Sequence, residues 1–230
     1  MTNVNFNQYD FFIFDCDGVI LDSNNFKNQI FLESVKHYSS KKISNFEKFI
    51  KVNKGLSRYY FYEYFFSKIA KLENKDIEKE YKKALNFYNN KIKANYKKCK
   101  YIPGVIKFIK KINKINKINK KNIFVISGSE ENELIKIFKE KNIYKYFHKI
   151  YGSPKSKIDN AMNLNLKIKS QKILYFGDSY YDYIVSKKIK SDFIFVSGYS
   201  DEIKLFKNKK INKIEDFKNL KLSNTNTITF

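Results

Sequence analysis

The chain has 230 residues, of which 43% are hydrophobic, so it is long and apolar enough to fold around a substantial core. No apolar run approaches the ~20 residues of a membrane span, and the polar N-terminus lacks the layout of a signal peptide. Two cysteines are too few for a disulfide framework or a metal cage. We therefore expect a globular, cytoplasmic protein with no membrane partner.

The net charge of +23 raises the question of nucleic-acid binding. The lysines are spread along the whole chain, and Lys, Asn, Ile, Phe and Tyr are over-used together, which indicates a general compositional bias. A basic nucleic-acid-binding protein therefore stays open only as a rival interpretation, and we expect no nucleic-acid partner.

The first predicted strand covers residues 9–15 and ends in two carboxylates. Four consecutive apolar residues, 11–14, are typical of a strand buried on both faces of a parallel sheet. Asp15 ends the strand, and Asp17 and Gly18 follow in a tight turn or small flap over residues 16–23. Because two carboxylates this close repel each other, the pair indicates a cation or a shared proton.

The next part of the chain is predicted to be helical throughout. Apolar residues recur with helical spacing over 24–38, 42–53 and 74–97, with an aromatic-rich segment over 58–72. No strand pattern occurs there, which predicts a smaller all-helical domain, residues 23–98, inserted after the first strand.

After Pro103, strand and helix patterns alternate. Strands are predicted over 123–126, 149–151, 172–176 and 192–196, and helices over 130–141, 156–165 and up to Lys190. A helix from Pro103 extends into the three-residue repeat at 112–120, short helical pieces are expected near 201–207 and 214–220, and the tail is polar. This alternation predicts an α/β fold with a doubly wound parallel sheet, formed by residues 1–22 and 99–230.

Polar side chains follow each of four predicted strands. In chain order they are Asp15 and Asp17, then Ser127, then Lys155 and Lys157, then Asp178 and Asp182. The carboxyl ends of parallel strands converge on one edge of a sheet. Oxygen ligands without His or Cys suit Mg²⁺, whereas lysine, serine and helix N-termini suit phosphate. The combination indicates phosphoryl transfer with a carboxylate nucleophile.

These residues resemble the four motifs of the haloacid dehalogenase-like (HAD) superfamily, in the right order. The first motif matches Asp15-Cys16-Asp17-Gly18-Val19, the second Ser127, the third Lys155 or Lys157, and the fourth Gly177-Asp178-Ser179 with Asp182. The resemblance implies a Rossmann-like core, and the helical insertion resembles the cap of the phosphoglycolate phosphatase and β-phosphoglucomutase subgroup.

The resemblance also implies roles. Asp15 would attack phosphorus and become an aspartyl phosphate, while Asp17 would protonate the leaving oxygen and then activate water. Dehalogenases of the superfamily lack the second aspartate, so Asp17 favours a phosphatase or a phosphomutase. Mg²⁺ would be held by Asp15, the Asp17 carbonyl and Asp178, with Asp182 close behind.

Ser127 and one lysine of the third motif would hold the transferring oxygens. The spacing from Pro154 favours Lys157, and Lys155 stays an alternative. The backbone of Gly128, directly after Ser127, is a candidate contact to substrate.

Two further cationic residues are candidates for substrate binding. Arg58 is the only arginine, and Gly55-Leu56-Ser57-Arg58 resembles the cap loop whose arginine grips an anion in β-phosphoglucomutases. Lys27 stands about where that branch has a histidine, which counts against mutase activity. A solvated helix lysine is an equally good interpretation of Lys27.

We therefore expect a Mg²⁺-dependent phosphatase, monomeric or weakly dimeric, acting on a small phosphorylated metabolite of the sugar or polyol phosphate kind. A sugar phosphomutase of the β-phosphoglucomutase type is the first alternative. A nucleic-acid-binding protein with a degenerate site is the alternative from another class.

Overall fold

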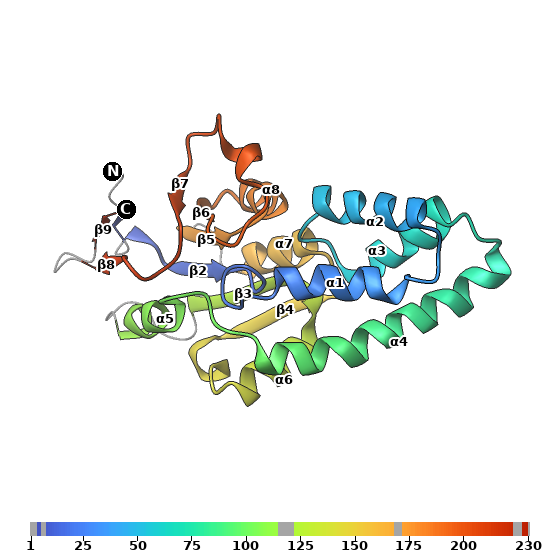
Figure 1. Cartoon of the computed structure of the whole chain (residues 1–230). Helices are drawn as coiled ribbons and strands as arrows, with labels where there is room; N and C mark the ends of the chain where they lie inside the picture. The colour runs from blue at the N-terminus through green and yellow to red at the C-terminus, as the bar shows by residue number, and fades with distance from the viewer. Residues whose placement is uncertain (1–3, 6–7, 115–121, 168–171, 223–226, 230) are drawn as a thin grey trace.

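The structure is a computed structural model that describes residues 4–5, 8–114, 122–167, 172–222 and 227–229. It consists of a parallel sheet covered by helices on both faces, and a group of helices beside the carboxyl ends of the strands (Figure 1). Strands β1 (Val4–Asn5) and β9 (Thr227–Thr229), near the two ends of the chain, pair on the side away from those helices.

Six parallel strands form the main sheet. Their order across the sheet is β4 (Lys149–Ser153), β3 (Ile123–Glu130), β2 (Phe11–Phe14), β5 (Ile173–Gly177), β6 (Asp192–Val196) and β7 (Asn212–Ile214). The chain runs outward from β2 to β4 on one side, then returns to place β5 on the other side of β2. The doubly wound topology predicted from the sequence is confirmed, and β2 lies at its switch point.

Helices cover both faces of this sheet, which explains the unbroken apolar run of β2. Phe12 and Phe14 pack in the core shared with α5 (Val105–Lys114) and α6 (Glu131–Glu140). Ile13 packs in the separate core shared with α7 (Lys157–Lys167) and α8 (Tyr180–Lys188). Since no face of the strand meets water, no polar alternation is expected in it.

The segment between β2 and α5 contains helices and no strand. Its elements are α1 (Asn24–Ser34), α2 (Ser40–Val52), α3 (Arg58–Tyr64), the π-helical turn η2 (Phe65–Ile69) and α4 (Asn74–Lys98). Aromatic rings fill its interior, with Phe31 and Tyr88 at 4.4 Å and Phe46 and Phe65 at 4.7 Å between centroids. Ring contacts of this kind explain why the segment is so rich in aromatic residues.

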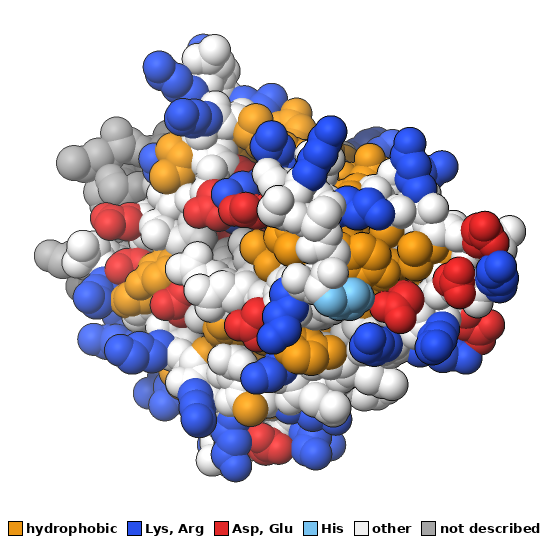
Figure 2. Space-filling view, turned by 45° about the vertical axis from the view of Figure 1, so that its right-hand side comes forward, with side chains coloured by type: hydrophobic (Ala, Val, Ile, Leu, Met, Phe, Trp, Pro, Cys, Tyr) orange, Lys and Arg blue, Asp and Glu red, His pale blue; other side chains and the backbone are white. Residues whose placement is uncertain are grey.

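Helix α4 has 25 residues, but its outer face carries many lysines. Figure 2 shows lysine and arginine side chains spread over the face drawn, with acidic side chains among them. Among the described residues, no helix is both long and apolar enough to cross a membrane. The buried face of α4 presents Ala84, Tyr88, Ile92 and Tyr96, which are spaced four residues apart. This face brings the two tyrosines toward the strand ends.

The last part of the chain differs from the sequence prediction. The 3₁₀ turn η5 (Ile203–Phe206) lies where a short helix was expected, but the helix predicted over 214–220 was wrong. Residues 212–214 form the edge strand β7, because pairing with β6 overrides the weak local pattern, and residues 215–220 form bends and turns. The predicted polar tail contains β8 (Lys221–Leu222) and β9 (Thr227–Thr229), and β9 pairs with β1 (Val4–Asn5). Residues 115–120 of the lysine-rich repeat lie outside the described residues.

Candidate active site

The turn after β2 is shaped by a glycine that no other residue would replace easily. Gly18 has a φ of +77°, and a Cβ on it would lie 2.2 Å from Asp178 Oδ2. Its amide donates a hydrogen bond of 2.8 Å to the Leu21 carbonyl, which closes the turn. The glycine therefore allows the end of β5 to approach the end of β2.

Asp15, Asp178 and Asp182 form a buried acidic cluster at these two strand ends. One carboxylate oxygen from each lies within 4.8 Å of the others. Burial and the charge of Asp182 raise the pKa of Asp15 to about 7, and burial and the charge of Asp15 raise the pKa of Asp178 well above its usual range. A divalent cation would relieve this repulsion, and a set of hard oxygen donors fits Mg²⁺.

Lys157 is the cation that lies inside this cluster. Its Nζ is 2.9 Å from Asp15 Oδ1 and 2.7 Å from Asp182 Oδ1, with its side chain 1% exposed. Asp182 Oδ1 also accepts a hydrogen bond from Tyr175, and Oδ2 accepts from Ser179. Since both oxygens of Asp182 are occupied, its carboxylate is best suited to orient Lys157, while Asp15 and Asp178 keep oxygens for a metal.

Lys155 lies elsewhere. Its side chain is exposed and lines a surface depression with Pro154 and Asn160, on the other side of the loop. Of the two lysines considered for the third motif, Lys157 therefore lies beside Asp15 and Lys155 does not.

The Asp17 carboxylate points away from this cluster, toward the helical segment. Its Oδ2 accepts hydrogen bonds from Lys27 (2.6 Å) and Ser129 (2.8 Å), and its Oδ1 accepts from Ser23 (2.5 Å) and Tyr96 (2.7 Å). Burial alone would favour the neutral acid, but the Lys27 ammonium and these hydroxyl groups hold the pKa of Asp17 well below its usual range. Asp17 is therefore ionised in this conformation.

The end of β3 supplies the remaining polar groups. Ser127 Oγ lies 3.5 Å from Asp17 Oδ2 and accepts a hydrogen bond from the Ser129 amide at 3.1 Å. Gly128 lines the pocket, and a Cβ on it would lie 2.4 Å from the Gly55 carbonyl. The glycine thus lets the loop before α3 lie directly over the end of β3.

Arg58 is buried, at 4% exposure, and is already paired. Its guanidinium contacts the carboxylate of Glu133 on α6 and donates a hydrogen bond of 2.5 Å to Asn89 Oδ1. Its Cζ lies 4.6 Å from the centre of the Tyr88 ring. The predicted anion-binding arginine therefore joins the helical segment to the α/β core in this conformation.

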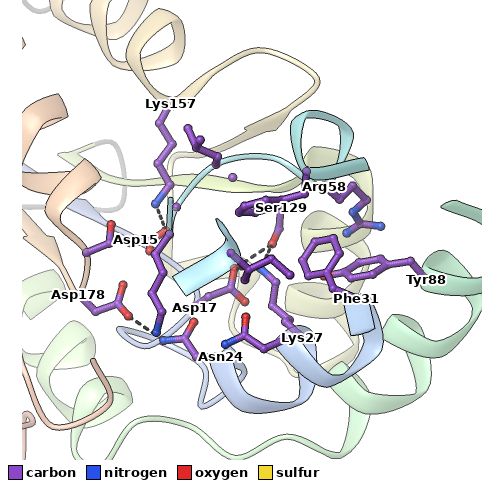
Figure 3. A pocket seen from close by; sticks show the side chains of 18 residues that line it. Asp15, Asp17, Asn24, Lys27, Phe31, Arg58, Tyr88, Ser129, Lys157 and Asp178 are labelled. Atoms are coloured by element: carbon purple, nitrogen blue, oxygen red, sulfur yellow. Dashed lines mark hydrogen bonds and ion pairs between the residues drawn. The ribbon is translucent and has the colours of Figure 1, made fainter. Parts of the chain in front are cut away.

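Part of this set lines one pocket with a volume of about 50 Å³ (Figure 3), and Ser127 and Asp182 lie behind that lining. Asp15, Asp178 and Lys157 lie at one end, and Arg58 and Tyr88 lie at the other. The other lining residues are Asp17, Asn24, Lys27, Asn28, Phe31, Ile50, Lys54, Gly55, Leu56, Phe61, Gly128, Ser129 and Ser179. The pocket lies between the helical segment and the strand ends.

Several residues of this site were not predicted. Ser129 had a signal, because alternate residues of a strand share a face and Ser127 was already a candidate. Tyr96 follows Tyr88 and Ile92 at helical spacing, which marks a buried face but not its chemistry. Nothing in the local sequence indicated that Glu133 would meet Arg58, 75 positions away.

The parallel sheet, its switch point and the acidic cluster with a buried lysine define a hydrolase of the HAD type. Residues 12–196 match the family model of the haloacid dehalogenase-like hydrolases, so the chain belongs to that family. The resemblance inferred from the four motifs is confirmed. A search of curated protein sequences gave no match.

Solved structures with the same fold share little sequence with this chain. A predicted phosphoglycolate phosphatase from Haemophilus somnus is 18% identical with a TM-score of 0.71, covering 92% of this chain and 96% of its own. A family IA, variant 3, HAD hydrolase from Entamoeba histolytica is 15% identical with a TM-score of 0.69, and the match covers 94% of this chain and 96% of that one. The magnesium-bound HAD hydrolase YfnB from Bacillus subtilis is 14% identical with a TM-score of 0.59, covering 91% and 95%.

Proposed function

We propose that this hydrolase is a Mg²⁺-dependent phosphatase that removes phosphate from a small metabolite of the sugar or polyol phosphate kind through an aspartyl phosphate on Asp15. The observation that carries the proposal is the position of Asp15, buried between the Lys157 ammonium and the Asp178 carboxylate. The predicted phosphoglycolate phosphatase and the magnesium-bound HAD hydrolase with the same fold support the same class of reaction.

Asp15 and Asp178 would hold the metal together with the main-chain carbonyl of Asp17. The ion would supply charge neutralisation, so that an anionic nucleophile and a phosphate can meet. Lys157 stays beside Asp15 and stabilises the negative oxygens of the phosphoryl group as it transfers. Ser127 and the backbone of Gly128 lie on the neighbouring strand end and complete the phosphate contacts.

Asp17 serves the two halves of the reaction in different protonation states. The ionised form seen here accepts a proton from water when the aspartyl phosphate is hydrolysed. Protonation of the leaving alcohol needs the neutral form, which the negative charge of a phosphate bound beside Asp17 would favour. Substrate binding would therefore change the protonation state of Asp17 while the helices stay closed.

Residues 23–98 act as a cap in this proposal. The pocket volume of about 50 Å³ is well below the roughly 300 Å³ of a typical ligand pocket, so substrate must enter with the helices displaced. Lys27 and Tyr96 come from the cap and contact Asp17 of the core. Closing the cap excludes water and brings these side chains to the reaction.

The deciding experiment measures phosphate release from a panel of phosphorylated metabolites, with Mg²⁺ and with a chelator. We expect release that needs Mg²⁺ and is lost in Asp15→Asn. No release from any member by folded protein would contradict the phosphatase. Isomerisation of a sugar phosphate that requires a bisphosphate primer would favour the mutase, and salt-dependent nucleic-acid binding unaffected by Asp15→Asn would favour the other rival.

The cytoplasmic location and the monomeric or weakly dimeric state stay predictions.

A further inference from the structure

Every cationic side chain that lines the pocket, among the described residues, lies beside a carboxylate. The pairs are Lys27 with Asp17, Lys157 with Asp15 and Asp182, Lys54 with Asp201, and Arg58 with Glu133. Lys27 and Lys157 contact the reacting carboxylates at the phosphate end. Lys54 and Arg58 are therefore the two lining cations that could bind a charged group elsewhere on the substrate.

The Arg58–Glu133 pair is the more deeply buried of these two. The two side chains are 4% and 6% exposed, whereas Asp201, the partner of Lys54, is 60% exposed at the rim. Figure 3 shows Arg58 at the end of the pocket away from Asp15. Asn89 Oδ1 accepts a second hydrogen bond from the Arg58 guanidinium. The charge of Arg58 and its hydrogen bonds are therefore largely satisfied within the protein.

The rings of Phe31 and Tyr88 lie beside Arg58 at this end of the pocket (Figure 3). The other apolar side chains of the pocket lining are Ile50, Leu56 and Phe61. The Tyr88 hydroxyl is buried and has no hydrogen-bond partner among the described residues. A buried hydroxyl without a partner is costly unless a ligand satisfies it, so Tyr88 is a candidate to bond a neutral group of the substrate at this end of the pocket.

We propose that the group esterified to phosphate is uncharged and carries a hydroxyl group that bonds Tyr88, and that Glu133 sets this selectivity by neutralising Arg58. A carboxylate or second phosphate at this end would have to displace Glu133 and leave its buried charge without a partner. A hydroxyl group satisfies Tyr88 and disturbs no ion pair. This inference rests on the proposed phosphatase activity and narrows its substrate class.

Matched substrates test the charge selection in the wild-type protein. Glycerol 3-phosphate and 3-phosphoglycerate differ by a hydroxymethyl group against a carboxylate, as do 2-hydroxyethyl phosphate and 2-phosphoglycolate. We expect kcat/KM to be roughly tenfold or more higher for the uncharged member of each pair. Equal or higher values for the carboxylates would overturn the inference while leaving the phosphatase intact. If folded protein releases phosphate from none of these four substrates and none from p-nitrophenyl phosphate, both the inferred selectivity and the proposed phosphatase activity are contradicted.

Glu133→Gln tests the assigned residue. It keeps the shape of the side chain and frees the charge of Arg58, so the ratio of carboxylate to uncharged substrate should rise by roughly tenfold. Arg58→Gln combined with Glu133→Gln should remove that gain. Asp201→Asn makes the same charge change at the rim and should shift the ratio less, and Glu140→Gln, exposed on the same helix, should not shift it. An unchanged ratio in folded Glu133→Gln, or an equal shift in Asp201→Asn, would contradict the role of Glu133.

Tyr88→Phe tests the hydroxyl contact separately. It should lower the ratio of kcat/KM for 2-hydroxyethyl phosphate to kcat/KM for ethyl phosphate, which has no hydroxyl group, by roughly fivefold or more. An equal loss for both substrates would show a packing effect and contradict the contact. Circular dichroism and thermal melting of each variant establish that it is folded.

Discussion

Lys27 Nζ lies 2.6 Å from Asp17 Oδ2, so an ion pair joins the first helix of the cap to the turn after the central strand. The exposed fractions of the two side chains are 17% and 9%, which leaves little water to screen the pair. Ser129 Oγ, on β3, also accepts from Lys27 and donates to Asp17. In the proposed mechanism, the cap therefore contacts the residue that changes its protonation state during the reaction.

Lys27→Met should destabilise the protein by about 3 kcal/mol, because it leaves the buried Asp17 charge without its cation. Urea unfolding at neutral pH measures this change. Lys48→Met removes an exposed lysine of α2 and should change the free energy of unfolding by less than about 0.5 kcal/mol. Equal effects of the two substitutions would contradict the importance of the pair.

Lys157→Met should lower kcat by about 10²–10³-fold, because it removes the ammonium group that faces the transferring phosphoryl oxygens. Lys155→Met is the matched control, since Lys155 has the same chemistry two residues away but is exposed. Steady-state phosphate release from a substrate found in the panel compares the two. A large loss in Lys155→Met with none in Lys157→Met would reverse the assignment made from the structure.

Cys99 is the C-cap residue of helix α4, and burial raises the pKa of its thiol to about 11. Burial acts in this direction because it disfavours the charged thiolate, the form that reacts. In native protein, alkylation by iodoacetamide should therefore be slow at pH 8 and accelerate about tenfold per pH unit up to pH 10. Mass spectrometry of the Cys99 peptide measures the rate. A rate that levels off near pH 9 would show an ordinary, accessible thiol.

The sequence predicted the sheet well because its strands are buried on both faces and read as continuous apolar runs. The residues after those runs, such as Asp15 and Asp178, could be placed at one edge by topology alone. The edge strand β7 escaped prediction because only one of its three residues, Ile214, is buried. A strand of that kind is specified by its neighbour β6 and not by its own pattern.

Contacts across the pocket could not be predicted in the same way. The partner of Arg58 depends on how the cap sits on the core, and local sequence does not encode the distance from Arg58 to Glu133. Arg58 lines the pocket, but its expected freedom to bind an anion depended on a neighbour that no motif indicates. Pairing of this kind changes the chemistry of a site without changing its motifs.

Mg²⁺ should raise the melting temperature of the wild-type protein, because binding to the folded state alone stabilises it by mass action. At a concentration of 100 times the dissociation constant the gain is about 2.7 kcal/mol. Asp178→Asn should lose most of this response, since it removes one of the two carboxylates that keep oxygens for the ion. Differential scanning calorimetry with Mg²⁺ and with a chelator measures it, and Asp76→Asn, an exposed residue of α4, should respond like the wild type. An unchanged response in Asp178→Asn would place the ion elsewhere.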